Sequence, residues 1–262
     1  IDQTSLSAVS LAGQVQFVLS LFISGIAAGA GIMAAQYWGK QDAASIEKVI
    51  PIALRTNLLF SGLFTILAGF CPEMLMRIFT NDAALVASGS QYLRAVALSY
   101  VLCGISQVYL ILLKNTGHAA VSSRISSTAV VLNIILNAIL IYGLCGAPAL
   151  GIRGAAYATV AARVVELIWA YLETKKPERV RILWNRLFSS AGKILSEDFW
   201  RYTLPVLAAS LVWGIAYVLY SVIMGHMGSD AVAANSITSI AKSLLSCLIR
   251  GVSGGAGVLI GN

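Results

Sequence analysis

Two asparagines one helical turn apart are the first residues in this sequence that could do chemistry. Asn133 and Asn137 lie within residues 125–152, a stretch without a single charged residue. At a spacing of i, i+4 two helical residues share one face, so both carboxamides point the same way. Such a pair can bind a cation or a polar group inside a membrane, or it can join neighbouring helices at about 0.6 kcal/mol per hydrogen bond. Both interpretations stay open at the level of sequence.

Lys242 is a second candidate because it falls near the middle of an apolar stretch, residues 229–261. A lysine at the centre of a membrane helix costs roughly 2.5–3.5 kcal/mol. We therefore expect it to face a central cavity or to pair with a carboxylate from a helix outside this chain. Its hypothesised role is in substrate binding or in coupling.

An aromatic and polar row adds a possible binding surface. Ser210, Trp213 and Tyr217 are spaced i, i+3 and i+7 and so lie on one helical face. They could line a cavity and stack on aromatic cations, or simply pack against neighbouring helices. Three further polar residues on apolar helices are candidates for lining the same passage: Gln14, Gln107 and Tyr109.

Other chemistries are not expected. The four cysteines show no CxxC spacing, and the two histidines lie at distant helix ends, so no metal site or disulfide framework is predicted. No cluster of His, Asp, Glu or Cys occurs at membrane depth, which argues against an intramembrane enzyme. The net charge of +7 could suggest a nucleic-acid partner, but the charges fall mainly in short loops between apolar stretches. We expect no enzyme activity, no cofactor and no nucleic-acid partner.

The elements that must position these residues are membrane helices. The chain is 58% hydrophobic and 11% charged, whereas soluble domains average about 25% charged residues. Stretches of roughly 20 apolar residues span a bilayer core. We predict an all-α polytopic bundle of seven helices at 4–37, 43–71, 83–114, 118–144, 151–173, 202–226 and 229–261. Breaks are expected at residues 115–117 and at Gly143, and Pro51 is expected to bend the second helix or end its first segment.

An internal repeat organises these helices. Residues 1–36 align without a gap on residues 227–262, and the glycine-rich segments 25–31 (GIAAGAG) and 251–257 (GVSGGAG) are the clearest match. A long repeat in an apolar chain is typical of transporters built from two related halves. The glycines are expected to allow close packing between helices.

Loop charges predict the orientation. Basic residues gather after the first, third and fifth predicted helices, so those loops are expected on the cytoplasmic side and residue 1 on the outside. The predicted helix 202–226 directly precedes the second copy of the repeat, so a corresponding helix is expected before the first copy. The result is two parallel six-helix repeats, of which this chain carries helices 2–8 of 12. We assign residues 1–173 to the first lobe and 201–262 to the start of the second. Residues 174–200 are a connector, either an amphipathic helix on the inner leaflet or a solvated linker.

Four segments in this order resemble the multidrug and toxic compound extrusion (MATE) family. They are residues 29–41 (GAGIMAAQYWGKQ), 132–143 (LNIILNAILIYG), 149–159 (ALGIRGAAYAT) and 199–205 (FWRYTLP). The resemblance implies antiport that is driven by H⁺ or Na⁺ and that exports bulky amphipathic, often cationic, compounds. It also implies a multi-pass protein of the plasma membrane that is monomeric when complete, with the bilayer, a small molecule and a coupling cation as its partners.

The resemblance also suggests where a cation acts and where this sequence departs from the family. It joins Asn133, Asn137 and Thr159 in a cation-linked network, but part of the family has aspartate where this chain has Asn137. A glutamate common in the seventh family helix is missing as well, because residues 208–210 read Ala-Ala-Ser. Arg163 and Glu166, at i, i+3, are interpreted as a structural ion pair. The alternative function is a flippase for lipids or lipid-linked oligosaccharides.

Overall fold

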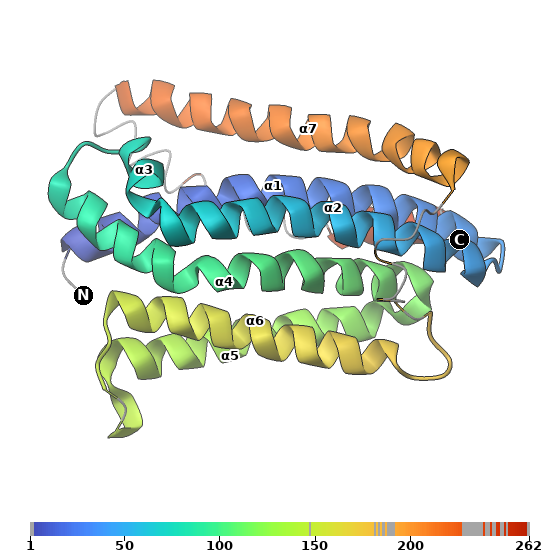
Figure 1. Ribbon diagram of the computed structural model, residues 1–262, viewed down its shortest axis with the longest axis horizontal. Coiled ribbons are helices and arrows are strands. Elements are labelled where there is room, and N and C mark those ends of the chain that lie inside the picture. The colour runs from blue at the N-terminus through green and yellow to red at the C-terminus, as the bar shows by residue number, and fades with distance from the viewer. Residues whose placement is uncertain are drawn as a thin grey trace.

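The computed structural model consists of long helices lying side by side, as Figure 1 shows. It describes residues 3–146, 148–180, 182, 184, 187, 192–226, 238, 242, 245, 246, 249 and 251–260. The helices are α1 (Gln3–Gly39), α2 (Ala43–Phe70), α3 (Pro72–Arg77), α4 (Ala83–Leu113), α5 (Ala119–Tyr142), α6 (Ile152–Thr174) and α7 (Lys193–His226). No strand occurs among the described residues, so the predicted all-α class is confirmed.

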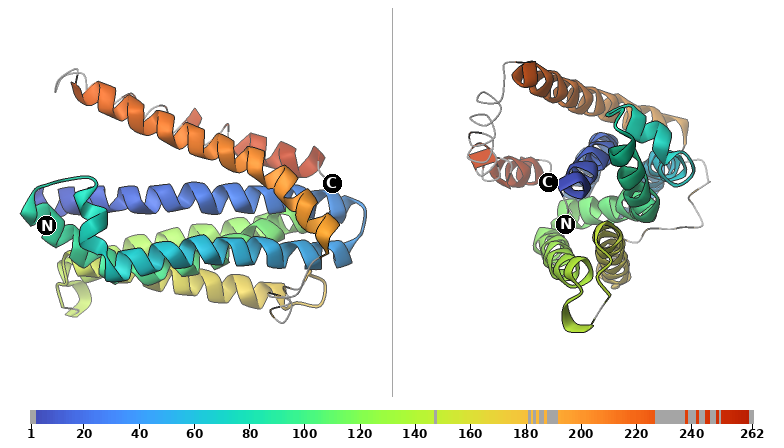
Figure 2. Two further views of the ribbon diagram at one scale, coloured as in Figure 1. Left: turned by 45° about the horizontal axis from the view of Figure 1, so that its top comes forward. Right: turned by 90° about the vertical axis from the view of Figure 1, so that its left-hand side faces the viewer.

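Helix α4 is the centre of the bundle. It packs against α1 and α2 on one side and against α6 on the other, while α5 is carried mainly by α6. Helix α7 packs on α1 at the opposite side of the bundle from α5 and α6 (Figure 2). Residues of α1, α4, α5 and α6 can therefore meet around one interior space.

The length and apolar character of these helices suit a membrane. Among the described residues, four helical stretches could cross one: Ser7–Gly39, Ala43–Phe70, Ala83–Tyr142 and Ile152–Thr174. The third comprises α4 and α5, which the turn Lys114–His118 joins. In that turn Thr116 and Gly117 leave the helical conformation, Gly117 with φ of +81°. The break predicted at residues 115–117 is thus confirmed and reverses the chain.

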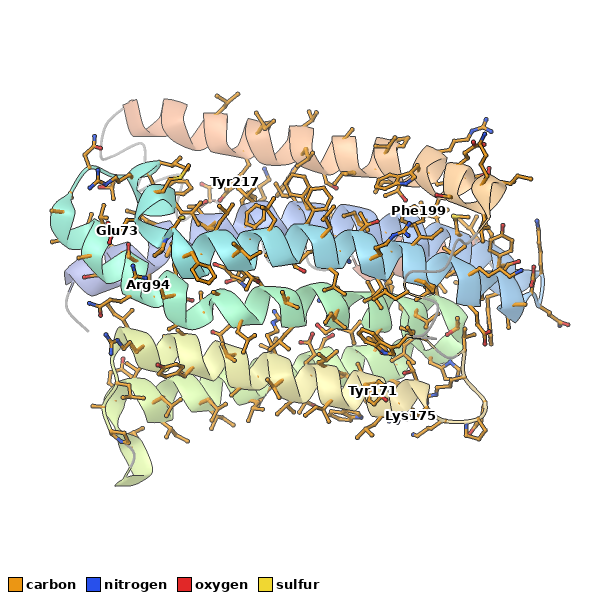
Figure 3. All side chains as sticks on the ribbon, in the orientation of Figure 1. Glu73, Arg94, Tyr171, Lys175, Phe199 and Tyr217 are labelled. Carbon is orange, nitrogen blue, oxygen red and sulfur yellow. The ribbon has the colours of Figure 1, made fainter. Side chains whose placement is uncertain are left out.

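Charged residues mark the two ends of the bundle. The end of α1, the start of α2, the turn between α4 and α5 and the end of α6 all lie together, where Figure 3 labels Lys175. The opposite end carries the ion pair between Arg94 and Glu73, whose nitrogen and oxygen are 3.9 Å apart. The basic loops predicted to be cytoplasmic therefore share one end.

Side-chain caps fix where two of these helices begin. At α2 the Asp42 carboxylate accepts hydrogen bonds from the backbone N–H of Ser45, at 3.0 Å, and from its hydroxyl. These bonds lower the pKa of Asp42, because they favour the ionised carboxyl group. At α4 the Asp82 carboxylate accepts from the backbone N–H of Ala84 at 2.8 Å. Both caps satisfy amides that a helix start leaves unpaired.

The ends of several helices differ from the sequence prediction. Helix α2 continues through Pro51, so this proline does not end a first segment; membrane helices tolerate proline because neighbouring groups satisfy the freed carbonyl. The short helix α3 was not predicted. Helix α7 begins at Lys193, nine residues before the predicted start at 202. The described part of the connector is not a solvated linker: Val180 is buried, and Trp184 donates a 2.8 Å hydrogen bond to the Tyr109 hydroxyl.

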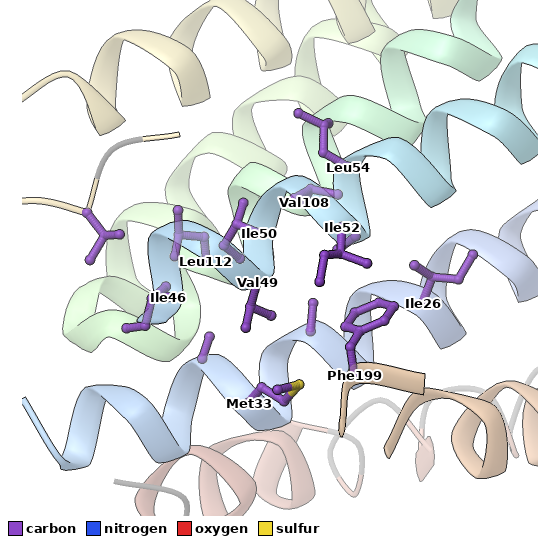
Figure 4. Close-up of a cluster of buried hydrophobic side chains, with 14 residues drawn as sticks. Ile26, Met33, Ile46, Val49, Ile50, Ile52, Leu54, Val108, Leu112 and Phe199 are labelled. Atoms are coloured by element: carbon purple, nitrogen blue, oxygen red, sulfur yellow. The ribbon is translucent and has the colours of Figure 1, made fainter. Parts of the chain in front are cut away.

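Apolar side chains fill the half of the bundle that lies nearer the end of α1 and the start of α2. Ile26 and Met33 of α1, a row of residues from α2, and Val108 and Leu112 of α4 enclose Phe199 of α7, as Figure 4 shows. Phe199 has no exposed surface. This cluster anchors α7 to α1, α2 and α4.

Glycines let α1 and α7 come close. A Cβ at Gly25 would lie 3.0 Å from Cα of Leu207, and one at Gly29 would lie 2.8 Å from Cα of Thr203. The predicted role of this glycine row in close packing is confirmed for the first copy. Much of the second copy lies outside the described residues, but Gly251–Ile260 is helical. It lies at the end of the bundle where α1 ends, as parallel repeats require (Figure 2).

We expect Gly154→Ala to destabilise the bundle, because α6 crosses α5 closely at this residue. A Cβ there would lie 2.7 Å from the carbonyl carbon of Leu140, which is backbone and cannot turn away. Overpacking of this kind costs about 1–3 kcal/mol. Thermal unfolding of the full-length protein in detergent should show a lowered midpoint. The matched control is Gly62→Ala in α2, where no described atom lies within 4 Å and alanine gains up to about 1 kcal/mol in helix propensity. Equal midpoints for the two variants would contradict the close crossing.

Candidate functional site

A chain of hydrogen bonds joins the three residues that the family resemblance grouped. The Asn137 side-chain amide donates to Oδ1 of Asn133 at 3.0 Å, and the Asn133 amide donates to Oγ1 of Thr159 at 3.4 Å. Thr159 donates its own proton to the carbonyl of Ala155, one turn earlier on α6, at 3.0 Å. The structure thus brings Asn133, Asn137 and Thr159 together across α5 and α6, while their role in coupling stays a prediction.

Helix α4 adds a hydroxyl to this network. Tyr92, which is 8% exposed, hydrogen-bonds to the Thr159 side chain. Because the Thr159 proton goes to Ala155, the Thr159 oxygen is an acceptor toward both Tyr92 and Asn133. Oδ1 of Asn137 is buried and has no hydrogen-bond partner among the described residues. The network therefore ends on an oxygen with free lone pairs.

A cavity of about 270 Å³ adjoins this network. Its wall comes from α1, α5 and α6, and five of its eight lining residues are polar or charged. The lining residues are Gln16, Ala129, Val130, Asn133, Thr159, Ala162, Arg163 and Glu166. A polar cavity between helices of membrane length is a natural site for a ligand or an ion.

A buried ion pair forms one side of the cavity. Nη1 of Arg163 lies 2.7 Å from Oε2 of Glu166, so the predicted pair is confirmed. The other carboxylate oxygen, Oε1, accepts a 2.6 Å hydrogen bond from the Ser106 hydroxyl on α4. Only 2% of the Glu166 side chain is exposed, against 28% for Arg163. Glu166 is thus held from two helices, while Arg163 opens toward the cavity.

The sequence contained a signal for this placement that our interpretation missed. Thr159, Arg163 and Glu166 are spaced i, i+4 and i+7, so they share one face of α6. That spacing places the ion pair on the surface that carries Thr159. Ser106 gives no comparable signal, because its contact with Glu166 depends on the packing of α4 on α6.

The three polar residues that the sequence suggested for the passage, Gln14, Gln107 and Tyr109, do not line this cavity. Gln16, and not Gln14, lines the cavity, since two positions along a helix turn the side chain by about 200°. Gln107 is half-buried and is not among the lining residues. Tyr109 corrects our expectation: it is 1% exposed, packs edge-on against Tyr171 at 6.2 Å and accepts the connector's hydrogen bond, away from the cavity.

The aromatic row of α7 meets a third ring from α1. The rings of Trp213 and Tyr217 are stacked with centroids 5.8 Å apart, and Phe17 lies 5.7 Å from Tyr217 and 6.3 Å from Trp213. Trp213 and Tyr217 are each 49% exposed. Ser210 bonds instead to its own helix, donating to the carbonyl of Val206 at 2.9 Å. Phe17, Trp213 and Tyr217 are not among the described residues that line the cavity.

Lys242 lies in a helical segment and is exposed. It forms no ion pair with a described residue and does not line the cavity. The structure therefore gives it no place in the site built by α1, α5 and α6. Its role in substrate binding stays a prediction about a surface outside that site.

Long apolar helices around a polar cavity are typical of polytopic membrane proteins. The MatE family profile matches residues 1–139, which is more than half of the chain. The chain therefore belongs to the MATE family of multidrug efflux transporters, and the resemblance drawn from the sequence is confirmed.

Individual relatives agree with this membership. The probable multidrug resistance protein NorM of Agrobacterium fabrum is 25% identical over 98% of the chain, and that of Rhizobium meliloti is 27% identical over 98%. A crystal structure of MATE in the bent conformation superposes with a TM-score of 0.83 at 23% identity, covering 99% of this chain and 57% of that one. The chain spans 55% of the length of these two curated relatives.

We expect removal of one partner of the Arg163–Glu166 pair to destabilise the protein more than removal of both. Glu166→Leu leaves the Arg163 charge without its counter-ion, which for a buried pair costs about 3–5 kcal/mol. The double variant Arg163→Met with Glu166→Leu leaves no charge and should unfold near the wild-type midpoint. Thermal unfolding in detergent measures both. A double variant as unstable as the single one would show that the pair's geometry, and not its charge balance, stabilises the bundle.

Proposed function

We propose that this chain is part of a secondary transporter of the plasma membrane that exports bulky amphipathic cations in exchange for H⁺ or Na⁺. The observation that carries the proposal is the cavity between α1, α5 and α6 with its network of Asn133, Asn137 and Thr159. Polar groups at this depth are expensive in a bilayer unless they serve a ligand or an ion. Occupancy of such a site by a cation would favour one conformation over another, which is the basis of exchange.

The network offers oxygen atoms to a coupling cation. Oδ1 of Asn137 is buried without a partner among the described residues, and the oxygens of Asn133 and Thr159 lie one hydrogen bond away each. Neutral oxygens of this kind can replace part of the hydration shell of Na⁺. None of the three side chains can accept a proton near neutral pH, so the network by itself supports Na⁺ better than H⁺.

The aromatic surface of Phe17, Trp213 and Tyr217 supports an aromatic or cationic substrate. Half-exposed rings stack on planar molecules and attract cations through their faces. Several relatives are named multidrug resistance proteins, which agrees with cargo of this class. The flippase alternative is less well supported. A pyrophosphate headgroup needs several cationic side chains, and among the described lining residues Arg163 is the only cation and is already paired.

Dye efflux from vesicles that contain the full-length protein tests this function. Ethidium release should accelerate when an inward gradient of H⁺ or Na⁺ is imposed, and the two gradients applied separately identify the coupling ion. Transport that ignores both gradients would reject cation exchange. Transport of a labelled lipid without dye release would support a flippase instead.

We expect Asn133→Ala to reduce gradient-driven efflux at least tenfold, because it removes the residue that links Asn137 to Thr159. If these amides only join helices, the loss would be about 0.6 kcal/mol per bond in stability with little change in coupling. The control is Thr65→Val in α2, which removes a 3.1 Å hydrogen bond to the carbonyl of Ala97 on α4, away from the cavity. Equal loss of efflux in both variants would assign Asn133 to helix packing.

We expect Trp213→Leu to weaken binding of planar aromatic cations about 2- to 30-fold, which corresponds to a cation–π interaction of roughly 0.5–2 kcal/mol. Fluorescence titration of the full-length protein with ethidium measures the change. Trp169→Leu is a matched control, since Trp169 is a partly exposed tryptophan on α6 that does not line the cavity. Unchanged affinity in Trp213→Leu would remove the aromatic surface from the proposed substrate path.

A further inference from the structure

The short helix α3 joins two membrane-length helices and exposes apolar side chains. It connects the end of α2 to the start of α4, at the end of the bundle opposite Lys175 (Figures 1 and 3). Met74 is 65% exposed and Ile78 is 68% exposed, and their spacing of i, i+4 places both on one face. Glu73 and Arg77, spaced in the same way, form a second exposed face, which is charged. The exposed side of α3 is therefore amphipathic.

The apolar face of α3 continues a row of exposed apolar residues on α2. That row consists of Leu59, Leu63, Ile66 and Phe70, each more than half exposed. Because Ala43–Phe70 is long and apolar enough to cross a membrane, we expect this row to face lipid chains. Met74 and Ile78 extend the row beyond Phe70 with the same spacing of four, although α2 has already ended. The lipid-facing surface thus reaches into the connection between α2 and α4.

The length of α2 places α3 at the boundary of the membrane core. Arg55 is exposed, lies four residues before Leu59, and is the last charged residue before Glu73. From Arg55 to Phe70 the helix rises about 22 Å at 1.5 Å per residue. The hydrocarbon core of a bilayer is about 30 Å thick, so the apolar row of α2 is about 8 Å too short to cross it. The segment that follows, α3, lies where the rest of the core must be covered.

Helix α4 indicates the same boundary independently. Arg94, whose side chain is 59% exposed, and Lys114, at the far end of α4, are separated by about 30 Å of helix, the thickness of the core. Residues 95–113 between them carry no charge. Nη2 of Arg94 lies 3.9 Å from Oε1 of Glu73. This ion pair places Glu73, and α3 with it, at the level where the hydrocarbon ends.

We propose that α3 is an interfacial anchor that binds the lipid leaflet at this end of the bundle. Phe70, Met74 and Ile78 lie among the acyl chains, and Glu73 and Arg77 lie in the headgroup layer. A helix with one apolar and one charged face rests in this way at the boundary between headgroups and chains. The anchor lies outside the four stretches of the described chain that could cross a membrane, so it adds a contact with lipid between two of them.

The inner side of α3 is fixed to α4, which holds the anchor at its depth. Met76 has no exposed surface, and a Cβ at Gly89 of α4 would lie 2.6 Å from the Met76 sulfur. Pro72 is buried too and opens α3, where its missing N–H costs no helical hydrogen bond. The backbone N–H groups of Phe79 and Thr80 both donate to the carbonyl of Met76 and end the helix. One face of α3 is thus taken by the protein, and the apolar exposed face is left for lipid.

Spin-label accessibility in phosphatidylcholine vesicles tests the anchor. Single cysteines in a cysteine-free form of the full-length protein carry a nitroxide, and collisions with oxygen, which concentrates in lipid, and with nickel ethylenediaminediacetate, which stays in water, are measured. Met74→Cys and Ile78→Cys should favour oxygen several-fold, at a depth of about 5–10 Å below the phosphates. Arg77→Cys should meet the nickel complex. Leu63→Cys on α2 is the lipid control, and Asn81→Cys, exposed in the loop after α3, is the water control.

Two other results would each overturn the anchor. If Met74→Cys and Ile78→Cys meet the nickel complex as readily as Asn81→Cys does, α3 lies in water. If both labels are shielded from both reagents, protein covers this face, either another part of the full-length chain or a second copy. Thermal midpoints near that of the unlabelled protein show that each variant is folded. None of these measurements involves export, so the outcome is independent of the proposed function.

Discussion

The constraint that shapes this bundle is the placement of one carboxylate inside it. Glu166 is 2% exposed, and an ionised carboxylate at this depth is tolerable only with a counter-charge and hydrogen bonds. Arg163 supplies the charge from the same helix, and Ser106 supplies a hydrogen bond from α4. The side-chain contact between α4 and α6 therefore has a fixed register, and the network of Asn133 and Thr159 lies one to two turns from it along α6. The need to satisfy the buried Glu166 carboxylate therefore affects both the packing of α4 on α6 and the charges that line the cavity.

The long helices could be predicted because the membrane leaves few alternatives. In hydrocarbon each backbone amide must bond within its own helix, so apolar stretches become helices and their ends follow glycine and charge. This is why the break at residues 115–117 and the end of α5 at Gly143, which has a left-handed conformation, were predicted correctly. Of the two expectations for Pro51, a bend or an end of the helix, the structure excludes the end, because α2 continues through it. The start of α7 was misplaced because Phe199 and its neighbours were assigned to the connector, and their burial against α1 and α2 depends on tertiary packing.

The site was predictable to the extent that it follows the periodicity of one or two helices. Asn133 and Asn137 are four residues apart, so it could be predicted that they share one helix face. Their contact with Thr159 was predicted from the family pattern on the next helix. Contacts between distant helices were out of reach: Ser106 is 60 residues from Glu166, and Tyr109 turns toward Trp184 of the connector, 75 residues away. The sequence alone also did not fix which face of α1 meets the cavity, so Gln14 was predicted to line it and Gln16 does so instead.

The first copy of the glycine-rich segment makes the close contact between α1 and α7. In the first copy, Gly25 and Gly29 hold α7 against α1 at backbone distance. In the second copy, no described atom lies within 4 Å of a Cβ built at Gly251 or Gly255. Helix α7 carries the aromatic surface and packs on the helix that carries Gln16 of the cavity. A Cβ at Gly29 would lie 2.8 Å from Cα of Thr203, so α7 and α1 touch through their backbones at this point. The helix that carries the aromatic surface and the helix that carries Gln16 of the cavity are therefore in backbone contact.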